Sequence, residues 1–460
     1  MPRADAPVRP RHAVFAFRGI ELAGRRIALR YALTGGPDLD IEFEESLVLP
    51  DQIPAPVPGD PQLAVLLDGI HRVFGVSYFK AAVPTSIDAA PGSERDAQFW
   101  DLLYTQGLSE FYFRNELTPI ATPAFPRSPE LPVRQGSPLR TSRGGSRPER
   151  VLTLVGGGKD SMLAREIVRH AGVETHALAL GRAVWIERSA AAMATPLITV
   201  ERILDPKLAQ LNARGAWNGH VPISACIAFV AELVAYLGDY RAIVAGNERS
   251  ADEGNTDWRG LRVNHQWSKS LEFEREFQAW CARALDEAPA YFSLLRPLSE
   301  IQIAAEFSRY PQYFEQFASC NANYKLSAAR PAERWCGKCP KCVFVQLIFA
   351  PFLTEPALTT MFGRRFIDDA ANLSLIAELT GIRGIKPFEC VGTVHESTFA
   401  LASLAQQGRL GAGLRDFYAE HFGDRAGSLL EQADSLLEPI PSPCMPVAWR
   451  ERLHAYLRHP

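Results

Sequence analysis

Alternating apolar and polar residues mark the first fifty residues of the chain. This period of two is typical of strands with one buried face. The pattern, with a turn at Gly24, predicts a small antiparallel sheet built from strands at 14–22, 26–33 and 40–44. Apolar residues then recur with a helical period over 62–73 and 94–107. We expect the aromatic residues from Phe99 onward to pack on the buried face of these helices rather than to bind a ligand.

The composition changes between Thr118 and Arg150, where Pro, Ser, Gly and Arg dominate. Such a segment has too little apolar surface to offset the entropy lost on ordering, so we interpret it as a linker or a mobile loop. The predicted organisation is therefore an N-terminal α+β domain over 1–125, a linker over 126–150, and further domains beyond it.

Strands and helices alternate after the linker. The pattern predicts strands at 151–156, 174–180, 197–204 and 242–247, and helices at 160–171, 206–214 and 222–237. This alternation is typical of an α/β fold with a parallel, doubly wound sheet, in which ligands bind beyond the carboxyl ends of the strands. We assign residues 151–354 to this domain. Residues 355–460 are expected to form a helical C-terminal region, with segments near 370–380, 396–408, 411–421, 425–437 and 446–458.

The composition limits the function classes. The chain has 460 residues, a formal net charge of -3 and a pI near 6.4, so a broad basic surface for nucleic acid is not expected. The apolar stretches at 225–238 and 343–353 are too short to span a bilayer, and no signal peptide is recognisable. We therefore expect a cytoplasmic protein without a membrane partner. In that compartment the eight cysteines are expected to bind metal or to be buried thiols.

The most informative segment is Val151–Ser161, an apolar run that leads through three glycines into the start of a helix. Glycine lets the backbone approach a ligand closely, and the free amides of a helix N-terminus favour phosphate. A Walker A loop needs Ser or Thr after its lysine, whereas Asp160 follows Lys159, and a Rossmann fingerprint needs a third spaced glycine that is missing. The segment therefore predicts a phosphate-binding loop of another type, and a glycine-rich turn without a ligand is the alternative.

This segment resembles the PP-loop of the ATP pyrophosphatases, whose pattern is Ser-Gly-Gly-x-Asp-Ser. Gly157, Gly158, Asp160 and Ser161 match that pattern, and Gly156 stands where the family usually has its first serine. The resemblance implies a PP-loop domain, similar to the adenine nucleotide alpha hydrolases. It also implies cleavage of ATP to AMP and diphosphate, usually by adenylation of a substrate oxygen.

A second motif contains cysteines. Cys336, Cys339 and Cys342 follow one another at intervals of three residues, and Cys320 offers a fourth thiol. Four thiolates at such spacing are typical of a closed, structural Zn²⁺ site, and buried or redox-active thiols are the alternative. We expect the remaining cysteines to be packed in the interior: Cys226, Cys281, Cys390 and Cys444.

Taken together, the polar motifs resemble one family, the ATP-dependent epimerases of UDP-N-acetylmuramoyl-L-alanyl-L-glutamate (MurL), which act in bacterial peptidoglycan precursor synthesis. The resemblance rests on the cysteine motif and on the segments 99–111, 156–161, 218–220, 247–250, 264–270 and 295–300. It implies that the terminal L-glutamate is inverted to D-glutamate through an acyl-adenylate, with ATP and Mg²⁺ required and AMP and diphosphate released. The partner would be a sugar-nucleotide dipeptide, and the oligomeric state is left open.

The resemblance and the chemistry of the side chains suggest roles. Asp160 is expected to help hold Mg²⁺. For proton transfer we expect His265 or Lys269, with His220 on the opposite face of the substrate, because the pKa values of these groups are easily tuned. The residues expected to contact ATP, its Mg²⁺ or the substrate are Gly156, Gly157, Gly158, Lys159, Asp160, Ser161, Asn247, Glu248 and Glu253. The candidates for the sugar-nucleotide diphosphate are Arg249, Arg259, Arg262 and Arg296.

Two alternatives stay open. One is a PP-loop enzyme that forms an amide or nitrile, as 7-cyano-7-deazaguanine synthase does, or that modifies tRNA, with ammonia or sulfur as the nucleophile. A similar four-cysteine motif follows the PP-loop domain of that synthase, but no amidotransferase or basic RNA-binding segment is apparent here. The other is a non-catalytic, zinc-stabilised nucleotide-binding protein, which the glycine at position 156 would favour.

Overall fold

The computed structural model describes residues 13–35, 40–117, 124–131, 149–324, 333–431 and 433–458, so most of the proposed linker lies outside the described residues. The strands are β1 (Val14–Ala23), β2 (Arg26–Thr34), β3 (Ile41–Val48), β4 (Ser86–Asp88), β5 (Arg150–Leu154), β6 (Glu174–Leu180), β7 (Leu197–Ile203), β8 (Ala242–Ala245), β9 (Thr256–Trp258), β10 (Leu261–Val263) and β11 (Ala290–Ser293). The α-helices are α1 (Pro61–Phe79), α2 (Glu94–Thr105), α3 (Ser109–Arg114), α4 (Lys159–His170), α5 (Val184–Ala192), α6 (Pro206–Ala213), α7 (Ile223–Leu237), α8 (Leu271–Ala284), α9 (Glu300–Phe307), α10 (Pro340–Phe349), α11 (Glu355–Phe362), α12 (Leu373–Leu379), α13 (Val394–Gln406), α14 (Ala412–Phe422), α15 (Ala426–Glu431), α16 (Ala433–Leu437) and α17 (Val447–Arg458).

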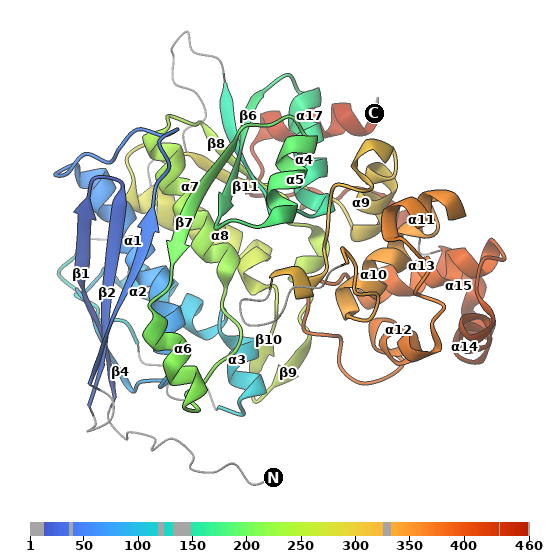
Figure 1. The fold of residues 1–460 in the computed structure, drawn as a ribbon, viewed down its shortest axis with the longest axis horizontal. Coiled ribbons are helices and arrows are strands. Elements are labelled where there is room, and N and C mark those ends of the chain that lie inside the picture. The colour runs from blue at the N-terminus through green and yellow to red at the C-terminus, as the bar shows by residue number, and fades with distance from the viewer. Residues whose placement is uncertain are drawn as a thin grey trace.

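One large sheet carries the fold, in the strand order β11-β8-β5-β6-β7-β3-β2-β1-β4. Its first five strands are parallel, which confirms the predicted α/β class with a parallel sheet. The N-terminal strands β1, β2 and β3 are antiparallel as predicted, but they do not form a sheet of their own. They extend the parallel sheet, because β3 pairs with β7 from Ser46↔Ile203 to Val48↔Glu201. Figure 1 shows this N-terminal half of the sheet at the left and the C-terminal helices at the right.

Each face of the parallel strands packs against a different core, because successive side chains of a strand point to opposite faces. In β8, Ala242 and Val244 belong to the core that includes α4, α9 and α10, whereas Ile243 and Ala245 belong to the core that includes α1, α7 and α8. Burial on both faces explains why β8 and β11 read as apolar runs without alternation, whereas β7 alternates between buried and partly exposed residues. The carboxyl ends of β5, β6 and β8 therefore lie between two helical layers.

The helical C-terminal region is confirmed, and the predicted segments correspond to α12 through α17. The helices that had no predicted segment are α3, α5, α8, α9, α10 and α11, and the strands are β4, β9, β10 and β11. β11 has four residues and all of them are buried, so it lacks the alternation that identifies a strand in a sequence. No helix in the described part of the chain combines the length and the apolar composition needed to cross a membrane.

His71 provides a pH-dependent contribution to stability. It is buried in α1, and its Nε2 lies 2.9 Å from the carbonyl oxygen of Arg30, a distance at which a neutral imidazole donates. Burial lowers the pKa of His71 to about 4. Because the unfolded chain binds this proton near pH 6.5, the contribution is present above pH 6.5 and is lost as the pH falls toward 4.

We expect the free energy of unfolding to fall between pH 7 and pH 5, with about 2 kcal/mol of the loss due to His71. Urea unfolding of the wild type and of His71→Gln at both pH values measures this share. The glutamine retains an N–H donor for the Arg30 carbonyl but does not titrate, so its loss should be about 2 kcal/mol smaller. Equal losses in the two proteins would contradict the assignment.

Candidate active site

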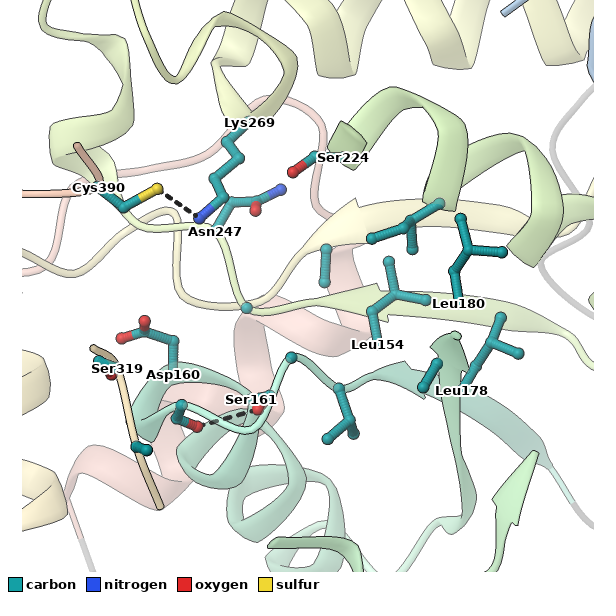
Figure 2. Close-up of a pocket in the computed structure, with 18 of the residues that line it drawn as sticks. Leu154, Asp160, Ser161, Leu178, Leu180, Ser224, Asn247, Lys269, Ser319 and Cys390 are labelled. Carbon is teal, nitrogen blue, oxygen red and sulfur yellow. Dashed lines mark hydrogen bonds between the residues drawn. The ribbon is translucent and has the colours of Figure 1, made fainter. Parts of the chain in front are cut away.

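A cavity of about 270 Å³ opens at the carboxyl ends of β5, β6 and β8. One wall is apolar and is formed by Leu154, Leu178, Leu180 and Ile227. The other walls carry polar side chains from distant parts of the chain, and Figure 2 shows Lys269 and Cys390 on one side with Asp160 and Ser161 on the other. The position agrees with the rule that ligands of parallel sheets bind beyond the carboxyl ends of the strands.

The glycine loop lines this cavity and leads directly into α4. Gly157 has a φ of 81°, a conformation that favours glycine, and Gly158 is the N-cap of α4 without a side-chain hydrogen bond to the helix amides. The first amides of α4 are therefore not capped by a side chain, which suits an anionic ligand. A Cβ on Gly156 would meet no atom within 4 Å, so the glycine at this position is not required by packing.

A cluster of buried, charged side chains adjoins the glycine loop. The Lys159 ammonium is fully buried and forms ion pairs with Asp160 and with Glu300, the first residue of α9. The Lys341 ammonium lies 3.8 Å from the other oxygen of Glu300. Burial works to raise the pKa of Asp160, but the positive charges of Lys159 and Lys341 outweigh it and lower that pKa. Asp160 is thus held ionised at the edge of the cavity.

Further polar groups at or near the cavity come from the loop after β8 and from the turn Trp267–Lys269. Asn247 lines the cavity and donates to the Ser293 hydroxyl at 3.0 Å. Glu248 is buried, and burial raises its pKa although the Lys269 charge opposes this. A Cβ on Gly246 would lie 3.0 Å from the backbone of Asp160, so glycine is needed where this loop passes the start of α4. Of the three residues predicted to transfer protons, Lys269 lines the cavity.

The two predicted histidines lie together outside the residues that line this cavity. Glu110 of α3 contacts both of them, with one carboxylate oxygen 2.5 Å from Nδ1 of His265 and 3.2 Å from Nδ1 of His220. The two imidazole rings are adjacent, with centroids 4.8 Å apart. His220 was expected on the opposite face of the substrate from His265 or Lys269. Glu110 of α3 brings the His220 and His265 rings to one carboxylate, and the face of the substrate that each would meet stays a prediction.

The same contacts shift the pKa values of the two histidines in opposite directions. Burial works to lower the pKa of His265, but hydrogen bonds to Cys390 and Glu110 outweigh it and raise that pKa to about 9. Burial and the charge of His265 lower the pKa of His220 to about 3. At neutral pH the pair consists of a protonated His265 and a neutral His220.

The four cysteines of the predicted zinc motif converge. Their sulfur atoms lie within 4.8 Å of one another. The Sγ atoms of Cys336 and Cys342 are 3.8 Å apart, which matches the edge of a tetrahedron with Zn–S bonds of about 2.3 Å. Gly337 has a φ of 66°, so glycine is needed in the turn that brings these thiols together. The donor set fits a single zinc ion.

Some of the polar residues suggested by sequence do not reach the cavity. Arg296 is buried, and it donates to the Glu248 carbonyl at 2.6 Å and lies 3.2 Å from a Glu274 oxygen, so it braces the loop after β8 and cannot bind a diphosphate there. The Glu253 carboxylate pairs with Lys386 at 3.0 Å.

Cys390 is a site residue that sequence reasoning missed. We expected it to be packed in the interior, but it lines the cavity with its Sγ 3.5 Å from the Lys269 ammonium. The sequence offered little signal, because Cys390 stands alone, outside the spaced cysteine motif. Glu110 and Glu300 were also not assigned roles, although both lie in segments that carried the family resemblance.

The amino-acid sequence matches known proteins along most of its length. Residues 8–294 match the model of the MurL N-terminal domain, and residues 316–413 match the model of the MurL C-terminal domain. A protein of Micromonospora sp., named UDP-N-acetyl-alpha-D-muramoyl-L-alanyl-L-glutamate epimerase, is 40% identical over 85% of this chain and 86% of its own length.

Two further proteins carry the same name. That of Xanthomonas oryzae pv. oryzae is 38% identical over 82% of this chain and 82% of its own length. That of Salinispora tropica is 39% identical over 84% of this chain and 82% of its own length. Both family models and these identities lead to one conclusion: the chain belongs to the MurL family.

Proposed function

We propose that this protein epimerises the terminal L-glutamate of UDP-N-acetylmuramoyl-L-alanyl-L-glutamate to D-glutamate, with ATP converted to AMP and diphosphate. The names of the three relatives support the epimerisation and its substrate. The observation that carries the ATP-dependent step is the single cavity onto which an uncapped glycine loop, the ionised Asp160 and Lys269 all open.

ATP fits the two kinds of wall in this cavity. The phosphates would lie against Gly156, Gly158 and Ser161, where the free amides of α4 favour negative charge. The purine would lie on the apolar wall around Leu154, Leu178 and Leu180 (Figure 2). Mg²⁺ would be held by Asp160, with Asn247 and Glu248 close to it, and would neutralise charge on the phosphates. Lys159 holds Asp160 in place from inside the protein.

Adenylation explains how the α-proton becomes removable. A free carboxylate places a full negative charge beside the carbanion that deprotonation would create. An acyl-adenylate removes this charge and leaves a carbonyl that accepts the electron pair as an enolate. A general base contributes about 10²–10⁴-fold, so the activation of the carboxylate must supply much of the remaining acceleration. Reprotonation from the other face inverts the centre, and hydrolysis releases AMP.

Of the residues predicted to transfer the proton, Lys269 is the one that can touch the substrate in this cavity. His265 and His220 would act through their neighbours, because neither lines the cavity, His265 hydrogen-bonds to Cys390 and both histidines contact Glu110. We propose that the zinc site is structural, since protein thiols can fill all four of its coordination positions.

Incubation with ATP, Mg²⁺ and the L-glutamyl substrate in D₂O tests the proposal. We expect AMP, diphosphate and a D-glutamyl product with deuterium at Cα, and neither inversion nor exchange when ATP is omitted. Formation of AMP with retained L-configuration, and an amide when ammonia is added, would instead support a PP-loop ligase. Inversion without ATP would contradict the adenylation step.

A further inference from the structure

Cys390 occupies a defined position at the cavity. It lies in the segment between α12 and α13, and Figure 2 shows its side chain beside that of Lys269 on one side of the cavity. The Val391 carbonyl accepts from Gln266 at 3.2 Å, and the Glu389 carboxylate accepts from the Lys341 backbone amide at 2.9 Å. The residues on both sides of Cys390 are therefore attached to other parts of the site, which restrains the backbone that carries its sulfur.

Two cations face this sulfur from different elements. The Lys269 ammonium lies 3.5 Å from Sγ, and the His265 imidazole, which Glu110 holds protonated, hydrogen-bonds to it. Lys341 adds a third positive charge from the start of α10. Burial works to raise the pKa of Cys390, but Lys269 and His265 outweigh it and lower that pKa to about 6. The sulfur is thus a thiolate at neutral pH.

The other single cysteines show the contrast. Burial raises the pKa of Cys226 and Cys444 to about 12, and it also raises the pKa of Cys281. None of these three lines the cavity. The arrangement around Cys390 is therefore not a general property of cysteines in this fold.

We propose that the Cys390 sulfur is the base that removes the Cα proton from the L-glutamyl residue, and that His265 and Glu110 are positioning residues that keep it ionised. The inference rests on the proposed function, because the proton becomes acidic only in the acyl-adenylate. A buried lysine whose pKa is raised by its neighbours, as that of Lys269 is, stays protonated and cannot be the base itself. Lys269 instead stabilises the thiolate and the negative charge that develops on the substrate.

The step balances without a further reactant. The S–H bond of Cys390 forms as the Cα–H bond of the glutamyl residue breaks, and the electron pair moves onto the acyl oxygen as an enolate. An acid on the other face of Cα then supplies a proton that derives from solvent, so the product has the D-configuration. The Cys390 thiol returns its proton to solvent before the next turnover, and the neighbouring ammonium and imidazolium favour this return.

The test separates this step from adenylation. ATP–diphosphate exchange dependent on the L-glutamyl substrate measures adenylation, and loss of hydrogen from Cα of the L-glutamyl residue in D₂O measures deprotonation. We expect Cys390→Ser and Cys390→Ala to retain exchange of diphosphate within about threefold and to lose deprotonation and inversion by at least about 10²-fold. Cys444→Ser, a buried thiol outside the cavity, is the matched control and should behave as the wild type.

Several results would overturn the inference. Inversion at the wild-type rate in Cys390→Ala would do so. The inference would also fail if Cys390→Ser still exchanged the Cα hydrogen of the L-glutamyl residue but no longer inverted this residue. Cys390 would then be the acid that donates a proton on the D face. A covalent glutamyl thioester on Cys390 after acid quenching would assign a nucleophile instead of a base. Absence of diphosphate exchange in the wild type would instead reject the proposed function.

The ionisation state of Cys390 can be measured separately from the reaction. Iodoacetamide reacts with thiolates, so the rate of Cys390 alkylation, followed by peptide mass, should level off above about pH 7 in the wild type. His265→Asn removes one of the cations that face the sulfur while Lys269 and Lys341 remain, so its profile should shift to higher pH. An unchanged profile would overturn the positioning role of His265, and a wild-type profile near pH 9 would overturn the role of Cys390.

Discussion

Asp160→Ala is expected to abolish the formation of AMP and diphosphate, with a loss of about 10³-fold in rate. The side chain stands at the start of α4 where the glycine loop opens into the cavity, and neighbouring lysines keep it ionised. Its removal takes away a carboxylate that we propose holds Mg²⁺ against the phosphates of ATP. Release of diphosphate from labelled ATP, measured with the L-glutamyl substrate present, gives the rate directly.

The fold should survive this substitution. Lys159 keeps its ion pair with Glu300 when Asp160 is absent, so no buried charge is left without a partner. We therefore expect the unfolding temperature to change by only a few degrees. Asp416→Ala, at an exposed position of α14, is the matched control and should retain full activity. Normal AMP formation by Asp160→Ala would refute the placement of the ATP site.

Cys339→Ser should remove zinc and strongly destabilise the C-terminal part of the protein. Cys339 is the N-cap of α10, and its sulfur accepts from the Cys342 amide at 3.4 Å while both thiols belong to the four-cysteine cluster. Structural zinc contributes directly to folding free energy, with apparent values of about 10–16 kcal/mol in small peptides. Because packing of α10 remains here, we expect a smaller effect, a decrease of about 10 °C in the unfolding temperature.

Metal analysis of the purified protein checks this prediction. The wild type should contain about one zinc ion per chain, and Cys339→Ser should contain almost none. Cys226→Ser changes a fully buried cysteine far from the cluster in the sequence, so it should keep its zinc whatever it does to packing. A zinc-free wild type with an unchanged unfolding temperature in Cys339→Ser would show that the four thiols are only packed.

The elements that sequence predicted well are those with a clear period. The boundaries of α2, α4 and β6 lie close to the predicted segments, because each of them has one apolar face or a continuous buried run, whereas α1 continues to Phe79, beyond its predicted end at 73. The glycine loop was found because its residues are contiguous. The cysteine cluster was found because three of its thiols share one short turn.

The partners of these residues could not be found in the same way. Glu300 meets Lys159, and Glu110 meets His265, only after the sheet has brought distant segments together. Cys390 looked like an isolated thiol for the same reason, since Lys269 and His265 lie more than 100 residues earlier. An ion pair or a shared proton leaves no periodic trace in one sequence, so only the fold reveals it.

The pairing of β3 with β7 also has a consequence for the order in which the protein is made. β3 is synthesised early, yet the strand that covers its edge follows roughly 150 residues later along the chain. Until β7 is made, the edge of β3 lacks its partner strand, and an unpaired strand edge is the kind of surface that pairs with other chains. Glu45 of β3 is buried and paired with Arg202 of β7 in the folded protein, and before β7 is made it is a carboxylate of the kind that discourages pairing of an open strand.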